Sequence, residues 1–342
     1  MTPQPIRVLI VDDSSYMRFV LGKVLGDDPG IEVVAAARDG LDALRLLDEL
    51  QPDVITLDIE MPRMNGYETL VQIMGRRPTP VIMVSSYAES GDNATIRALE
   101  LGAVDFVRKP DRRESLTMDA VRDELIAKIK MAASVHPEAE TPAPAAFVKK
   151  APQTPQDMKK LVVIASSTGG PKALAKVLPA IPSDLPVGII VVQHMPVGFT
   201  ASLAARLDQL CPFQVAEARE DDVLRAGRVL VAPGGFHLRI RPQGRVRLSA
   251  SATVNNVRPA ADVTMEDAAA VYGDKVIAVV LTGMGADGTR GCAAIRAKGG
   301  ATIAQNAATC VVDGMPASLI KAGHADYIVP LSRIAREIQE LV

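Results

Sequence analysis

Short apolar runs alternate with amphipathic segments along residues 6–133, and this alternation limits the possible folds more than any other feature of the chain. The runs are IRVLIV, IEVVAAA, PDVITL, PVIMVS and VDFV, and each is followed by a stretch with helical periodicity. Short apolar runs of this kind are typical of strands buried on both faces. Five consecutive strand–helix units predict a parallel, doubly wound (βα)5 sheet.

A second strand–helix pattern fills residues 158–342. The apolar runs LVVIAS, VGIIVVQ and KVIAVVLT end in polar or glycine-rich residues, and helical stretches lie between them. The segment HLRIRPQGRVRLS predicts a β-hairpin with four arginines on one face, namely Arg239, Arg241, Arg245 and Arg247. We therefore expect a second doubly wound, mostly parallel α/β domain that carries a β-hairpin.

The segment between the two patterns has the composition of a linker. Residues 134–157 contain five prolines and no apolar periodicity, which is typical of a semi-rigid connection rather than a packed fold. The sequence therefore predicts a first domain over residues 1–133, a Pro/Ala-rich linker over 134–157 and a second domain over 158–342.

Charge and cysteine content exclude several classes of protein. The net charge of the whole chain is −2, which argues against a general affinity for nucleic acid. No apolar run approaches the roughly 18 residues that cross a bilayer, so we expect no membrane insertion. The three widely spaced cysteines form no CxxC pair, and the first residues lack a signal-peptide pattern. Both features predict reduced thiols and a cytoplasmic location.

Three aspartates follow strands of the first predicted sheet. Asp12 and Asp13 come directly after the first strand, and Asp58 ends the third. Asp12 and Asp13 could alternatively serve as helix caps. In a flavodoxin-like strand order the first and third strands are neighbours, so the three carboxylates would converge at the carboxyl edge of the sheet. Such a group of hard oxygen ligands suits Mg²⁺.

A hydroxyl and an ammonium group are expected at the same edge. Ser85 ends the fourth strand, and Lys109 follows the fifth. Ser86 is the neighbouring alternative to Ser85. Together with the cation, these groups would bind an anion beside Asp58, and an aspartate can accept a phosphoryl group as an acyl phosphate.

The segment IASSTGGPKAL, residues 164–174, could hold a serine nucleophile. From Ala165 it has the pattern small-x-Ser-x-Gly around Ser167, close to the nucleophile elbow of serine hydrolases. The helix that follows would offer backbone N–H groups to an oxyanion. An ST-turn that caps this helix is the structural alternative.

A serine nucleophile needs a base and an orienting acid. His194 directly follows a strand of the same predicted sheet, and Asp287 lies in the glycine-rich loop after another. The order of the triad in α/β-hydrolases would instead favour His324 as base. Backbone N–H groups of Met284 and near Thr168 are candidate oxyanion donors.

The loop that holds Asp287 also contains a GxGxxG pattern. Gly283, Gly285 and Gly288 follow a strand and precede a helix. A dinucleotide site would need an acidic residue about 20 positions further on, and residues 300–308 contain none. The pattern is therefore weak evidence for a dinucleotide.

Residues 6–130 resemble the receiver domain of two-component response regulators. The resemblance rests on the carboxylates, Ser85 and Lys109, and it implies that a partner histidine kinase phosphorylates Asp58. It also implies that Asp12, Asp13 and Asp58 hold Mg²⁺ and that Ser85 moves toward the phosphate. Phe106 lies where the family has a mobile aromatic residue.

The motifs SSTGG, VVQHMP, LTGMGADG and DGMPASLI, behind such a receiver, resemble the chemotaxis protein-glutamate methylesterases. The resemblance implies Ser167 as nucleophile, His194 as base and Asp287 as orienting acid. It implies glutamate methyl esters on chemoreceptors as substrate, with glutamine deamidation as a second activity and no cofactor for ester hydrolysis. Ala165 stands where many relatives have glycine.

Two other classes of function are open at this point. The first is a response regulator that binds DNA, which the net charge of +5 on residues 158–342 would permit. The absence of a helix-turn-helix pattern argues against it. The second is a docking module without catalysis.

Overall fold

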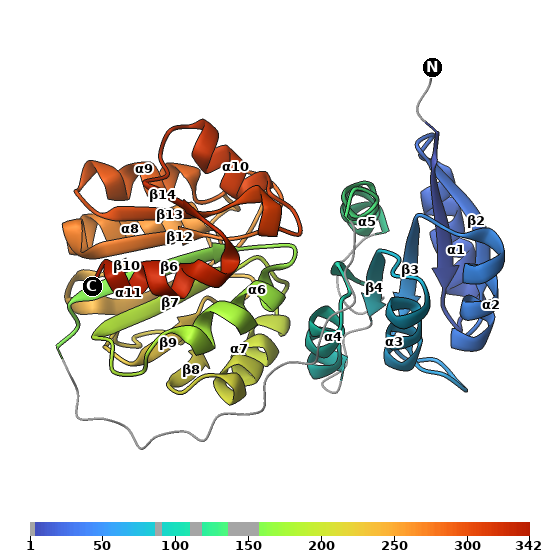
Figure 1. Cartoon of the computed structure of the whole chain (residues 1–342), viewed down its shortest axis with the longest axis horizontal. Coiled ribbons are helices and arrows are strands. Elements are labelled where there is room, and N and C mark those ends of the chain that lie inside the picture. Colours follow the sequence, from blue (N-terminus) through green and yellow to red (C-terminus); the bar gives the residue numbers. More distant parts are fainter. Residues whose placement is uncertain (1–3, 86–90, 110–117, 136–156) are drawn as a thin grey trace. The chain divides into compact units, whose positions relative to one another are not determined.

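The computed structural model describes residues 4–85, 91–109, 118–135 and 157–342. The chain divides into two compact units, residues 1–143 and 144–342, and the division falls within the segment expected to be a linker. Most of that linker lies outside the described residues, as does Ser86. Figure 1 shows a sheet in each unit, with helices packed against it.

The first unit contains a five-stranded parallel sheet in the order β2-β1-β3-β4-β5. Its strands are β1 (Ile6–Val11), β2 (Ile31–Ala37), β3 (Val54–Asp58), β4 (Val81–Ser85) and β5 (Asp105–Arg108). All its strand pairs are parallel, and the pairing of Val11 with Leu57 brings the carboxyl ends of β1 and β3 side by side. The predicted (βα)5 fold and the adjacency of the first and third strands are confirmed.

Helices alternate with these strands. They are α1 (Ser15–Gly26), α2 (Gly40–Leu50), α3 (Gly66–Arg76), α4 (Gly91–Glu100) and α5 (Met118–Ala132). The Ser14 hydroxyl accepts from the backbone N–H of Met17 and begins α1, and Asn65 and Glu68 form a reciprocal capping box that begins α3. Both caps end the preceding loop at the carboxyl edge of the sheet, beside the aspartates.

The second unit contains a seven-stranded sheet in the order β14-β13-β12-β6-β7-β9-β8, and every pair is parallel. The strands are β6 (Lys160–Ser166), β7 (Val187–Gln193), β8 (Gln214–Glu217), β9 (Arg228–Val231), β12 (Val276–Val280), β13 (Ala301–Gln305) and β14 (Tyr327–Val329). The helices are α6 (Gly170–Val177), α7 (Phe199–Leu210), α8 (Ala261–Tyr272), α9 (Thr289–Ala297), α10 (Gly314–Lys321) and α11 (Ile334–Glu340).

Strand β6 lies at the centre of this sheet, where the chain order reverses. Strands β7 and β12 flank it, and Ala165 pairs with Val192 on one side and with Val280 on the other. Every residue of β7 and β12 is buried, so other elements cover both faces of the sheet. In open parallel sheets, sites form at the carboxyl ends of strands next to such a reversal. The loops after β6, β7 and β12 meet that description.

The predicted β-hairpin is present as β10 (His237–Arg241) and β11 (Arg245–Ser249). The antiparallel register pairs Arg239 with Arg247 and Arg241 with Arg245, and all four side chains are exposed. The alternate residues Leu238, Ile240 and Val246 are buried and belong to the apolar core that includes α8. The hairpin therefore closes one side of the core and turns its arginines to solvent.

In the part of the chain that the structure describes, no helix has both the length and the apolar character needed to cross a membrane.

Candidate active site and carboxylate pocket

Ser167 lies in the turn between β6 and α6. Its backbone N–H donates to the carbonyl of Thr282, the residue two positions after β12, at 3.0 Å. Gly169 has a φ of +76° and precedes α6, whose first turn contains Pro171. The turn therefore needs glycine, and it leaves the half-buried Ser167 in front of a helix N-terminus. Ala165 remains in β6, where its methyl group is buried, so it lies before the turn.

The glycine-rich loop after β12 lies directly against the serine. A Cβ atom at Gly283 would lie 2.8 Å from the Cβ of Ser167 and 3.0 Å from its backbone nitrogen. Any side chain at this position would therefore push the loop away from Ser167. Glycine at position 283 therefore lets the loop backbone lie close to Ser167. A GxGxxG pattern also uses glycine for close contact, but here the neighbouring group is a serine and not a nucleotide.

Gln193, the last residue of β7, links the ends of β6 and β7. Its Oε1 accepts from the Ser166 hydroxyl at 2.6 Å, and its Nε2 donates to the carbonyls of Ser167 and His194 at 2.9 and 3.2 Å. Gln193 is buried, so these hydrogen bonds fix the backbone on both sides of the site. The sequence patterns did not predict this residue, although a polar residue at the end of a buried strand could have signalled it.

The structure brings His194 and Asp287 into direct contact. His194 Nε2 lies 2.7 Å from Asp287 Oδ2, and Asp287 is 2% exposed. The backbone N–H groups of Ala261 and Asp262, at the start of α8, donate to the same carboxylate at 2.6 and 3.1 Å. A buried carboxylate at a helix N-terminus is stabilised by these N–H groups and by the helix dipole.

These contacts decide the protonation state of Asp287. Burial acts to raise the pKa of the carboxyl group, but the hydrogen bond and charge of His194 and the backbone donors outweigh it and hold the pKa below its usual value. Asp287 is therefore ionised at neutral pH and can stabilise a protonated imidazole.

Ser167 and His194 follow adjacent strands, and within the described ranges the Ser167 hydroxyl has no hydrogen-bond partner. Catalytic hydrogen bonds are often long in enzymes without substrate. The Nε2 atom of His194 is engaged by Asp287, so Nδ1 is the nitrogen that remains for a proton from serine.

The two other histidines of this unit lie in different surroundings. His237 is buried between the carbonyl of Ala252 and the N–H of Ala260, which indicates a structural role. His324 precedes β14, and β13 and β12 separate β14 from β6. Over the ranges that the structure describes, His194 is the histidine that contacts a carboxylate.

The expected oxyanion donors border the same turn. Thr168 is buried, and its carbonyl accepts from the hydroxyl of Thr282 at 3.0 Å. Met284 is 49% exposed, and its backbone N–H has no acceptor among the described residues.

The N-terminus of α9, by contrast, is already occupied. Asp262 Oδ1 accepts from the N–H groups of Gly288 and Gly291 at 3.0 and 2.8 Å. A dinucleotide phosphate would need these donors, so the structure gives no support to nucleotide binding.

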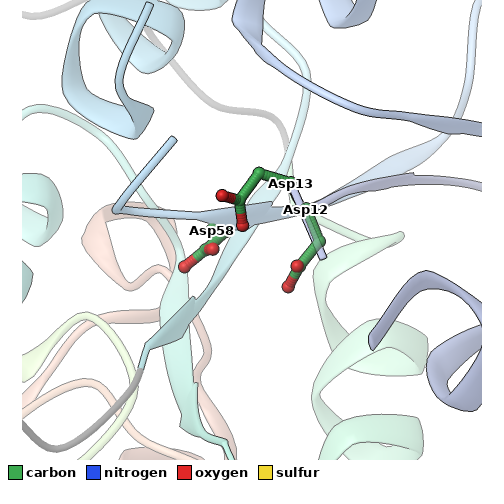
Figure 2. A group of neighbouring side chains, drawn as sticks. All are labelled: Asp12, Asp13 and Asp58. Atoms are coloured by element: carbon green, nitrogen blue, oxygen red, sulfur yellow. The ribbon is translucent and has the colours of Figure 1, made fainter. Parts of the chain in front are cut away.

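The first unit gathers its three aspartates at the carboxyl edge of its sheet, as Figure 2 shows. Candidate ligand atoms of Asp12, Asp13 and Asp58 all lie within 4.8 Å of one another, and Asp13 is the exposed member. Lys109 Nζ lies 2.8 Å from Asp12 Oδ2 and 2.7 Å from Asp58 Oδ2. The structure therefore brings Lys109 into the pocket with all three carboxylates.

One ammonium group does not balance this pocket. Burial raises the pKa of Asp58 to about 6, although Lys109 acts to lower it. Burial acts to lower the pKa of Lys109, but the charges of Asp58 and Asp12 raise it above its ordinary value. Among the residues that the structure describes, the pocket thus holds three carboxylates and the ammonium group of Lys109, and its hard oxygen donors fit a divalent ion such as Mg²⁺.

Two further residues of the receiver prediction lie on neighbouring strands. Ser85 is the last residue of β4 and pairs with Arg108 of β5. Phe106 is buried, and Lys128 of α5 lies 5.3 Å from the centre of its ring and donates to its carbonyl at 2.6 Å. Lys128 therefore connects the position of this ring to α5.

Comparisons with known proteins match both units. Residues 162–338 match the family model described as CheB methylesterase, and residues 8–121 match that of the response regulator receiver domain. A protein of Symbiobacterium thermophilum is 51% identical over 99% of this chain and 98% of its own length. One of Thermotoga maritima is 49% identical over the whole of both chains. The chain belongs to the CheB methylesterase family.

Both relatives are named protein-glutamate methylesterase/protein-glutamine glutaminase. The crystal structure of the CheB methylesterase catalytic domain of Thermotoga maritima is 49% identical, with a TM-score of 0.52 over 54% of this chain and 98% of that one. The expected combination of a receiver domain with a methylesterase domain, and the enzyme class, are confirmed at the level of the family. The site residues stay predictions.

The burial of Asp58 predicts a pH-dependent stability. The folded-state pKa of about 6 exceeds the ordinary 3.8, so the folded chain binds more protons between these values. In metal-free buffer, the free energy of unfolding of the first unit should fall by on the order of 2 kcal/mol as pH rises from about 4 through 6. Urea unfolding at several pH values measures this fall. Asp58→Asn should abolish it, and Asp48→Asn, an exposed change on α2, should leave it. An identical fall in Asp58→Asn would contradict the assignment.

Proposed function

We propose that this chain is a serine hydrolase that removes methyl groups from glutamate methyl esters on the cytoplasmic helices of chemoreceptors and also deamidates glutamines there. The observation that carries the proposal is the 2.7 Å contact between His194 and the buried, ionised Asp287 at the strand end next to Ser167. The names of the relatives support the substrate class.

In the first half of the reaction, Ser167 Oγ attacks the ester carbonyl and His194 takes its proton through Nδ1. Asp287 holds the imidazole through Nε2 and stabilises the positive charge that develops on it. Backbone N–H groups of Met284 and near Thr168 would stabilise the oxyanion. Removal of a single donor of this kind typically costs 10²–10³ in kcat.

In the second half, His194 returns its proton to the leaving group. Methoxide leaves poorly without this proton, so the same residue must act as base and then as acid. Water, activated by His194, then hydrolyses the acyl-enzyme and releases the glutamate side chain and Ser167. Attack on a glutamine amide follows the same course and releases ammonia.

The two alternative functions, a DNA-binding response regulator and a docking module without catalysis, have less support. A DNA-binding regulator would need a reading element such as a helix-turn-helix, and the described part of the second unit is a parallel α/β fold without one. A docking module without catalysis would not need a buried carboxylate aligned with a histidine beside a serine turn.

The proposed triad can be tested with methylated receptor as substrate. Ser167→Ala and His194→Ala should each lower the rate of methanol release by at least about 10³-fold, and the double variant should be little worse than either, because the residues act as a unit. His324→Ala, the matched control, should keep nearly full activity. Loss of activity in His324→Ala with activity retained in His194→Ala would assign the base to His324.

We further propose that a histidine kinase phosphorylates Asp58. Asp12, Asp13 and Asp58 would hold Mg²⁺, which would neutralise charge on the transferring phosphoryl group. The proposal is supported by the excess negative charge of the pocket and by the match of residues 8–121 to receiver domains. Asp58 accepts the phosphoryl group through its carboxylate, and Lys109 stabilises the anion that results. Ser85 would then move toward the phosphate, and Phe106 would reorient.

Phosphorylation from a small donor such as acetyl phosphate should therefore require Mg²⁺. Asp13→Ala removes an exposed ligand and should raise the Mg²⁺ concentration needed for half-maximal phosphorylation, while Asp58→Asn should accept no phosphoryl group. Intact-mass spectrometry over a Mg²⁺ titration measures both effects. Full phosphorylation of the wild type in excess chelator would contradict the three-carboxylate site.

Phosphorylation of the receiver is proposed to release the esterase from inhibition. The proposal is supported by the match of residues 8–121 to receiver domains, because a receiver that did not control the esterase would not need a phosphorylation site. Activation is a population shift, and a tenfold effect requires a difference of only about 1.4 kcal/mol between the two states.

Residues 157–342 alone should then hydrolyse ester faster than the unphosphorylated full chain and should not respond to acetyl phosphate. Asp58→Asn in the full chain should stay at the low basal rate because it cannot be phosphorylated. Initial rates of methanol release compare the three proteins. If the fragment is no faster than the unphosphorylated chain, the receiver activates the site or delivers it to the receptor instead.

A further inference from the structure

A two-residue turn beside the active site carries an asparagine whose amide lies between two buried carboxylates. Val254 and Val257 exchange backbone hydrogen bonds of 3.2 and 3.0 Å, and Asn255 and Asn256 between them have φ values of +54° and +62°. Asparagine tolerates this left-handed conformation better than most residues. Both positions therefore satisfy the turn, but only the first contacts the site.

The Asn255 amide nitrogen donates to Asp287 Oδ1 and to Asp262 Oδ2, each at 2.9 Å. An amide nitrogen has two hydrogens, so it can serve both carboxylates at once. Asp262 is 3% exposed, and among the described residues Asn255 is the only donor to its Oδ2. The other oxygen of Asp262 binds the backbone N–H groups of Gly288 and Gly291, just after Asp287.

Few positive charges compensate this pair of carboxylates. Among the described residues, the titratable or charged groups that face them are His194, which contacts Asp287, and Arg290, whose exposed guanidinium is bound to Glu266. The remaining partners of the two carboxylates are neutral N–H donors. Within the part of the chain that the structure describes, Asn255 is the only one of these donors that uses its side chain, and the others are backbone N–H groups. The alignment of Asp287 with His194 thus depends on neutral hydrogen bonds to buried carboxylates. Asn255 itself is exposed and its two bonds are partly buried, but both end on charged groups, which strengthens them.

We propose that Asn255 is a positioning residue for catalysis: it bridges Asp262 and Asp287 and so keeps Asp287 Oδ2 aligned with His194 Nε2 during proton transfer. The proposal rests on the proposed esterase function. Asn255 acts through Asp287 and not on the substrate, so its loss affects the chemical step more than substrate binding.

Alanine variants of the two asparagines form a matched pair. Both substitutions remove an asparagine from a left-handed position of the same turn, so both strain the backbone alike. Asn255→Ala should lower kcat for methanol release roughly tenfold with KM unchanged, as expected for the loss of a hydrogen bond to a charged group. Asn256→Ala should keep wild-type kcat and KM. Thermal unfolding of both variants checks that they are folded.

Asn255→Asp gives a second test, the pH profile of kcat/KM. A purely structural role of Asn255 would leave this profile unchanged. A third carboxylate next to Asp287 favours protonated His194, so the acid limb of the pH profile of kcat/KM should shift to higher pH. Asn256→Asp adds the same charge to the same turn without the contact and should shift the limb much less.

Two results would overturn the proposal. One is equal kcat values for Asn255→Ala and Asn256→Ala, and the other is equal acid limbs for the two aspartate variants. If Asn255→Ala does not fold, the aspartate pair decides alone, since it keeps the size of the side chain. Full activity of Ser167→Ala would instead refute the proposed function, so the two failures are distinguishable.

Discussion

The second unit depends on one buried charge, the carboxylate of Asp287. An ionised group in a protein interior is tolerated only when charges and hydrogen bonds compensate it. Here His194, two backbone N–H groups at the start of α8 and the Asn255 amide all point to this carboxylate. These contacts also fix the position of the imidazole, so the requirement to stabilise the charge and the requirement to orient a base are met by the same atoms.

The parallel sheet makes this arrangement possible. Strand β6 is flanked by β7 and β12, so the residues after these three strands share one edge although they are far apart in sequence. Glycine at 283 lets the loop after β12 lie against Ser167, and Gln193 ties the ends of β6 and β7 together. The receiver unit uses the same principle, since Asp58 is the last residue of β3, and Asp12 and Lys109 directly follow β1 and β5.

Sequence patterns predicted the five strands of the first sheet, strands β6, β7 and β12 of the second and the hairpin, and they pointed to candidate site residues, because both follow from local chemistry. Apolar runs indicated these strands, and polar residues at or directly after their ends indicated Asp58, Ser167 and His194. Strands β8, β13 and β14 were not predicted. The roles of Asn255, Asp262 and Gln193 were not predicted, because each depends on contacts between distant segments. No spacing rule relates the Asn255 turn to Asp287, 32 positions later. A resemblance to relatives supplied the substrate, which residue chemistry alone does not define.

Covalent labelling tests the central claim, that the His194–Asp287 pair activates Ser167 as the nucleophile. Phenylmethylsulfonyl fluoride sulfonylates serines that a neighbouring base activates. Incubation of the full chain with this reagent, followed by peptide mass spectrometry, should place the label on Ser167, and Asp287→Ala should reduce the rate of labelling strongly. Labelling of a different residue together with loss of esterase activity, or equal rates in the wild type and Asp287→Ala, would contradict the account.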